Sequence, residues 1–255
     1  MSYAPPPERQ DRQEQAAAQP GRAAPQYSAD GRWYWDGQQW RPVAAPGPMW
    51  ARPYGPPESR AAAAVALVAL AIAGAALSFV GEAIDLLAAL VAPGSIVETI
   101  GAGFQIVASL ASMAGLLGSA IALPMWMHRS FRNLPALGAT GLSWSPAWAA
   151  GGWFIPLANL VIPYLVTREL WIHASGEPER VSPLLPLWWG AWVGAYVLHV
   201  LQGASNSVGR TSRVGGDVLG ILNDVGLVLA GALLIVLVQR ITRRQRARHA
   251  QLLSA

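Results

Sequence analysis

An acidic residue inside an apolar stretch is the first residue of this chain whose type and position suggest chemistry. Asp224 lies within the apolar run 218–238, and Asp217 lies seven residues earlier on the same helical face. Inside a membrane, an ionisable side chain marks a proton, ion or substrate pathway by default. The alternative is that this helix enters the membrane only near Val225, which leaves both acids in an outer loop.

A carboxylate and an imidazole share one face of an earlier helix. Glu169 and His173 are four residues apart, so the pair has the spacing to bind a metal or to relay a proton. Two ligands make a poor metal site without others, and an ordinary surface helix pair is the competing interpretation. Arg168 points about 100° away from Glu169 on a helix, so these two residues do not pair.

The motifs of the common catalytic classes are missing. The chain contains no cysteine, which excludes disulfides, thiolate nucleophiles and cysteine metal sites. It also lacks the HExxH, Gly-x-Ser-x-Gly, P-loop and Rossmann glycine patterns. We therefore expect a protein that is not an enzyme and that holds no cofactor.

The elements that must position Asp224 are membrane-spanning helices. Hydrophobic residues make up 53% of the chain and charged residues only 13%, which is too little charge for a water-exposed surface. Residues 61–80 are uncharged and form about 30 Å of helix, the thickness of a bilayer core. Further spans are expected at 103–127, 184–201 and 218–238. Residues 81–102 carry Glu82, Asp85 and Glu98 without an arginine, so we expect them to form an outer loop with a surface helix at 83–91. The sequence predicts an all-α, polytopic transmembrane bundle whose main partner is the lipid bilayer.

A fifth apolar segment is interrupted by prolines. Residues 133–167 are uncharged, but they contain Pro135, Pro146, Pro156 and Pro163. Proline removes a helical hydrogen bond and clashes with the preceding turn. We therefore expect the broken segment 145–167 to be re-entrant or interfacial rather than a straight span. A complete crossing, which gives five spans, is the alternative.

Positive charges predict the orientation of the chain. Arg129 and Arg132 follow the second span, and five of the eighteen arginines lie within 240–248 after the last one. Such clusters flank the cytoplasmic ends of spans. With four spans, both termini are then cytoplasmic, the protein lies in the plasma membrane, and residues 246–255 form a basic tail end. The basic cluster is a membrane flank, so we expect no binding to nucleic acid.

The N-terminal residues 1–60 have the composition of a disordered, cytoplasmic tail. They contain eleven prolines and too few apolar residues to offset the entropy of the chain. Within them, Asp36-Gly37 predicts a two-residue turn in a hairpin over 32–41, with Trp33 opposite Trp40. Because a lone hairpin is marginal in water, it needs a partner or the membrane surface for stability.

Several stretches around and after the broken segment carry a longer motif: His128–Asn133, Leu142–Leu160, Pro163–Tyr164, Arg168–Trp171 and Leu187–Trp192. With these stretches, residues 61–245 resemble the actinobacterial DUF4328 membrane family. The Trp-rich element at 33–40 is similar to a DUF2510-like motif. The resemblance implies a membrane domain and supplies no mechanism. The family-like motif contains Trp148, Trp153, Pro156, Asn159, Pro163, Arg168 and Glu169.

The physical properties of this motif suggest two roles. Trp148 and Trp153 suit a membrane interface, whereas Pro156 and Pro163 break the helix around Asn159. The Asn159 amide either satisfies the backbone groups that the break frees, or the opened backbone binds an ion or polar ligand, as in broken-helix transporters.

Three hypotheses for function follow from these residues. The first, which the sequence favours, is a membrane anchor or interaction protein whose Pro-rich tail recruits a protein partner. The second is a small transporter or channel-like homo-oligomer that uses the broken segment and Asp224. The third, a membrane enzyme that uses Glu169 and His173, has the least support.

Overall fold

The structure is a computed structural model of the chain, and it divides into two units. The described residues are 26–28, 33–35, 38–42, 52–91, 96–175, 180–206 and 210–254. The first unit is Met1–Gly47 and the second is Pro48–Ala255. Most of the residues predicted to be disordered, in 1–60, lie outside the described residues.

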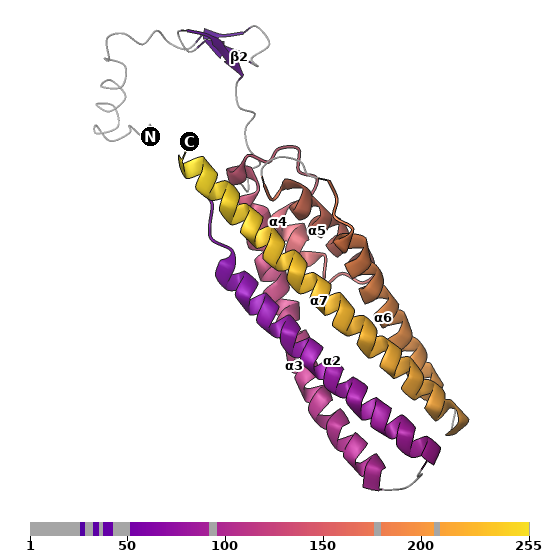
Figure 1. Cartoon of the computed structure of the whole chain (residues 1–255). Helices are drawn as coiled ribbons and strands as arrows, with labels where there is room; N and C mark the ends of the chain where they lie inside the picture. Colours follow the sequence, from indigo (N-terminus) through magenta and orange to yellow (C-terminus); the bar gives the residue numbers. More distant parts are fainter. Residues whose placement is uncertain are drawn as a thin grey trace, which may run out of the picture. The chain divides into compact units, whose positions relative to one another are not determined.

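Four long helices form the second unit (Figure 1). They are α2 (Glu58–Val91), α3 (Ile96–Asn133), α6 (Leu184–Asn206) and α7 (Arg210–Ser254). All four are long and apolar enough to cross a membrane. α2 packs against α3 and α7, and α6 packs against α7. The prediction of an all-α transmembrane bundle with four spans is confirmed for this unit.

The helices are longer than the predicted spans. We expected an outer loop with a surface helix at 83–91, but α2 continues unbroken to Val91. The prediction of a loop was wrong because the residues after Gly81 are mostly Ala, Leu, Ile and Glu, which favour or tolerate a helix. α7 likewise begins at Arg210, before the predicted span at 218–238.

The broken segment folds as short helical pieces. They are η1 (Pro135–Leu137), α4 (Pro146–Gly151), η2 (Ala158–Leu160) and α5 (Ile162–His173). The Ser145 hydroxyl accepts a hydrogen bond from the Trp148 backbone N–H and caps α4. Leu157, directly after Pro156, has a φ of 63°, in the left-handed region that non-glycine residues rarely adopt. Proline and this strained turn prevent a straight helix, and the segment is not among the four candidate spans.

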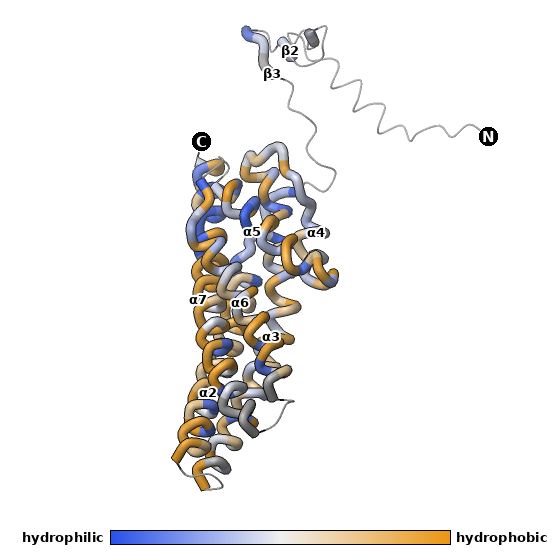
Figure 2. Tube along the Cα trace, turned by 90° about the vertical axis from the view of Figure 1, so that its right-hand side faces the viewer, coloured by the Kyte–Doolittle hydropathy of each residue, from blue (hydrophilic) through white to orange (hydrophobic). Residues whose placement is uncertain are grey.

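These pieces lie at the end of the bundle where α7 finishes (Figures 1 and 2). A buried polar network holds that end together. The Asn133 side chain accepts from the Gly55 N–H at 3.0 Å and donates to the Gly55 carbonyl at 2.9 Å. Gln245 Nε2 donates to the Ser130 carbonyl at 2.9 Å. These bonds join α3 to α7 and to the segment before α2.

The outer surface of the long helices is apolar. Figure 2 shows hydrophobic residues along much of each helix and hydrophilic residues gathered near α5 and the C-terminal part of α7. Exposed apolar side chains include Leu110, Leu117, Val200 and Leu229. A bundle with a mostly apolar exterior is suited to a lipid environment.

The first unit contains a small antiparallel sheet. Its strands are β1 (Gln26–Tyr27), β2 (Trp33–Trp35) and β3 (Trp40–Pro42), in the order β1-β2-β3. The register places Trp35 opposite Trp40, with ring centroids 5.7 Å apart in an edge-to-face arrangement. The predicted pairing of Trp33 with Trp40 was therefore wrong. The two aromatic rings of Trp35 and Trp40 are in contact across the strands. The predicted turn residues Asp36 and Gly37 lie outside the described residues.

Candidate intramembrane site

Polar side chains from three long helices meet inside the bundle. Glu82 of α2 accepts a hydrogen bond from Gln202 Nε2 of α6, at 2.9 Å. Asp224 of α7 lies close enough to Glu82 for the two carboxyl groups to interact electrostatically. Asn223 Nδ2 lies 3.3 Å from Asp224 Oδ1. We call Glu82, Gln202, Asn223 and Asp224 the acidic site.

The two carboxyl groups of the acidic site are incompletely satisfied. Only 5% of the Asp224 surface is exposed, and its buried Oδ2 has no hydrogen-bond partner. Glu82 Oε2 is also buried without a partner. A buried carboxylate that lacks partners is costly. The arrangement therefore favours a bound proton or cation.

Further polar groups surround the acidic site. Ser78 lies beside the Asp224 carboxyl group, and its hydroxyl donates to Gln105 Oε1 of α3 at 3.0 Å. Asp217 and Asp85 also interact electrostatically with Glu82. All four long helices thus contribute polar side chains to this region.

A glycine leaves the space that the Glu82 carboxyl group occupies. A Cβ atom at Gly220 of α7 would collide with both Glu82 carboxylate oxygens and with Gln202 Nε2. Only a residue without a side chain lets the Glu82 carboxyl group lie against α7. Gly220 therefore belongs to the construction of the site.

The depth of the acidic site follows from the length of α7. Sixteen residues separate Asp224 from Arg240, which corresponds to about 24 Å of helix. If Arg240 lies at one membrane surface, Asp224 lies inside a hydrocarbon core of about 30 Å, toward the opposite surface. The neighbouring Leu222 and Val225 are exposed and apolar. The acid therefore faces the bundle interior while its neighbours face lipid.

The acidic site can bind a proton or a cation through carboxyl and amide oxygens. Within the described residues, no group of three or more His, Cys, Asp or Glu side chains is arranged to hold a metal ion. Carboxyl and amide oxygens are the kind of ligand that hard cations take in proteins.

The motif residues lie elsewhere, in the broken segment. Trp148 is 46% exposed, as suits an interface anchor, and Trp153 Nε1 donates to Met127 Sδ at 3.0 Å. Asn159 lines a cavity, and its buried Oδ1 has no hydrogen-bond partner. Pro156 and Pro163 flank this turn. One role that the sequence suggested for the Asn159 amide was to satisfy backbone groups freed by the break. The Asn159 Oδ1 does not do this.

Glu169 has a structural contact. It is buried in α5, and its Oε1 accepts a hydrogen bond from the Ser143 backbone N–H. The neighbouring Arg168 is exposed. His173 is the last residue of α5. Glu169 thus ties α5 to the loop before α4.

Sequence reasoning identified Asp224 and missed its partners. Glu82 was assigned to an outer loop, and Gln202 was not considered. The missed signal was continuity, because the helix-favouring sequence runs on after Gly81 without a proline. Which faces of α2, α6 and α7 meet is a property of packing that the sequence did not reveal.

Comparison with known proteins gives a family and no function. No curated protein and no solved structure matches the chain. A family model described as a domain of unknown function (DUF4328) matches residues 94–243. The match covers α3, the broken segment, α6 and most of α7, which is more than half of the chain. The chain is a membrane protein that belongs to the DUF4328 family.

Proposed function

We propose that this protein is a non-enzymatic plasma-membrane protein that binds protons or small cations at the acidic site and transports them. Both termini are cytoplasmic in this proposal, which the arginine clusters support. The observation that carries it is the buried Asp224 Oδ2, which has no partner although the side chain is only 5% exposed.

Two neighbouring acids explain why a cation is expected to bind. Glu82 and Asp224 repel each other when both are ionised, and the apolar bundle interior weakens screening by water. A proton on one acid, or a cation between the two, removes this repulsion. Movement of that charge between the membrane surfaces is the step that the proposal assigns to the bundle, acting as one chain or as a homo-oligomer.

Flux measurements test the proposal. The full chain is reconstituted in liposomes, and proton, sodium and potassium gradients are imposed separately. Asp224→Asn and Glu82→Gln keep the side-chain shape but remove the charge. Because a hydrogen bond to a charged group contributes about 1.5–3 kcal/mol, each change is expected to lower flux at least about tenfold.

Glu169→Gln is the matched control, since Glu169 is also a buried acid but lies at the other end of the bundle. It is expected to retain wild-type flux. The proposal fails if the wild-type protein moves none of the three ions, or if Asp224→Asn conducts as well as the wild type.

A second candidate is an interaction protein whose N-terminal unit recruits a protein partner. Trp33 and Trp40 are 45% and 48% exposed on the small sheet, and exposed tryptophans are frequent anchors of protein interfaces. Affinity purification from membranes compares the full chain, a chain lacking residues 1–47 and the Trp33→Ala, Trp40→Ala double variant. Identical partners for all three would contradict this candidate.

A further inference from the structure

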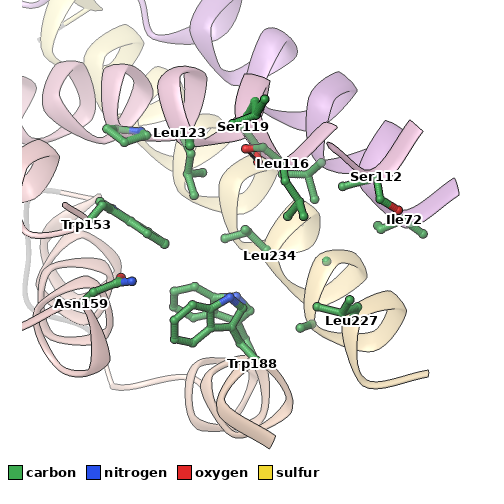
Figure 3. Close-up of a pocket in the computed structure, with 18 of the residues that line it drawn as sticks. Ile72, Ser112, Leu116, Ser119, Leu123, Trp153, Asn159, Trp188, Leu227 and Leu234 are labelled. Carbon is green, nitrogen blue, oxygen red and sulfur yellow. Dashed lines mark hydrogen bonds between the residues drawn. The ribbon is translucent and has the colours of Figure 1, made fainter. Parts of the chain in front are cut away.

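An apolar cavity of about 440 Å³ lies within the bundle (Figure 3). Its walls come from all four long helices, and Trp153 and Asn159 of the broken segment line it at one end. Most of its lining is apolar, as with Leu123, Trp188 and Leu234. Leu117 lines the cavity and is 63% exposed. The cavity therefore opens to the lipid-facing surface of the bundle.

A basic pocket of about 360 Å³ lies further along α3. It is lined by Arg52, His128 and Arg132, together with Ser145 and the start of α4. Arg60 and Arg129 also interact electrostatically with His128. The four arginine side chains Arg52, Arg60, Arg129 and Arg132 thus create a positive potential at this pocket, which favours an anionic group.

The apolar cavity and the basic pocket are neighbours along α3. Ala120 and Pro124 line the cavity, and His128 and Arg132 line the basic pocket. Pro124 and His128 are four residues apart, so these two residues lie on the same side of the helix, one turn from each other. The eleven helical steps from Leu117 to His128 rise about 16 Å. This is close to one membrane leaflet, which is half of a hydrocarbon core of about 30 Å.

We propose that these two features form one binding site for an anionic phospholipid. The phosphate of the lipid lies in the basic pocket against Arg52, His128 and Arg132, and one acyl chain enters the apolar cavity. Asn159 lines the same cavity, and its Nδ2 can donate a hydrogen bond to an ester carbonyl of the lipid. Basic pockets between membrane helices commonly bind anionic headgroups.

Charge and apolarity together favour a phospholipid over other occupants. A free phosphate would use the basic pocket and leave the cavity empty. A zwitterionic lipid would fill the cavity, but its own cation would be repelled by the four arginine side chains. An anionic lipid satisfies both features, and the open side of the cavity lets it enter from the bilayer.

Native mass spectrometry of the purified full chain tests the site, with melting temperature as a second measurement. Phosphatidylglycerol and phosphatidylcholine with identical acyl chains are added separately. The wild type is expected to retain phosphatidylglycerol preferentially and to melt at a higher temperature with it. The His128→Gln, Arg132→Gln double variant is expected to lose roughly fivefold or more of this preference. Ala120→Phe fills the cavity and is expected to reduce retention of both lipids.

Two matched controls keep the test specific. Ala114→Phe changes an exposed alanine of α3 outside the cavity lining, and Arg240→Gln removes an exposed arginine outside the basic pocket. Both are expected to behave like the wild type. Misfolding of a variant is recognised by its melting temperature without added lipid.

Three results would overturn the proposal. The first is that the wild type retains both lipids equally. The second is that Arg240→Gln reduces the lipid preference as much as the double variant does. The third is that millimolar inorganic phosphate displaces phosphatidylglycerol. The last result would identify a site for free anions. None of these outcomes depends on ion flux, so the lipid site and the proposed transport fail separately.

Discussion

At the scale of single residues, the side chains of Asn133 and Asn159 differ in whether their buried amide oxygen has a hydrogen-bond partner. Asn133 bonds to both backbone groups of Gly55. Asn159 leaves its Oδ1 without a partner at a cavity. A polar group that is buried and satisfied holds the fold, whereas one that is unsatisfied remains open for a ligand.

Asn133→Ala is therefore expected to destabilise the protein by about 1–3 kcal/mol, because it leaves the Gly55 N–H and carbonyl unpaired. Asn159→Ala is expected to change stability by less than about 0.5 kcal/mol. Melting temperatures in one detergent, without added lipid, compare the two. Equal losses would show that Asn159 also holds the fold.

Tyr54 gives a prediction for alkaline pH. It stacks on His249 with ring centroids 3.9 Å apart. Burial, with a smaller contribution from Glu58, raises the pKa of Tyr54 from 10.0 to about 12. The native state therefore holds this proton more tightly than the unfolded state does. Protonated Tyr54 therefore makes its full contribution to the free energy of unfolding below pH 10, and this contribution is lost as the pH rises to about 12.

Between pH 10 and 12, the wild type is expected to lose melting temperature more steeply than Tyr54→Phe, which has no phenol to titrate. A pH series of melting curves for both proteins measures this difference. Parallel curves would mean that Tyr54 titrates alike in the folded and unfolded states.

At the scale of elements, small residues let α2 and α3 approach closely. A Cβ atom added at Gly115 would lie 2.7 Å from the Ala71 Cα, and one at Gly74 would collide with the Ser112 backbone. Gly74 with Ser78 and Gly115 with Ser119 are pairs of small residues four apart, a spacing typical of close packing between membrane helices. The structure shows such packing at the two glycines.

Gly115→Leu is expected to destabilise the α2–α3 contact by about 1–3 kcal/mol through overpacking. Gly103→Leu is the control, because a Cβ atom at Gly103 has nothing within 4 Å. Thermal unfolding in detergent should separate the two variants. Similar melting temperatures for both would argue against close contact at Gly115.

At the scale of the whole molecule, the number of spans decides which segments of the chain lie on the same side of the membrane. Four spanning helices bring the broken segment and the end of α7 to the same side. The chain has no cysteine, so a single introduced thiol is labelled without background. Ser175 follows α5, Ser254 ends α7, and Ala102 lies near the other end of α3.

Ser175→Cys and Ser254→Cys are expected to react with a membrane-impermeant maleimide only after cell lysis. Ala102→Cys is expected to react in intact cells. Labelling of Ser175→Cys and Ser254→Cys as well as Ala102→Cys in intact cells would mean that the broken segment crosses the membrane, which gives five spans.

The sequence by itself determined the four spans, the break in the fifth apolar segment and the candidate Asp224. Apolar length and proline act locally, so they can be read without knowing which helices touch. Only the tertiary structure decided that Glu82 and Gln202 join Asp224, and that Trp35 rather than Trp33 faces Trp40. These pairings depend on helix faces and strand register, which are fixed by the fit of distant side chains, such as Glu82 against Gly220.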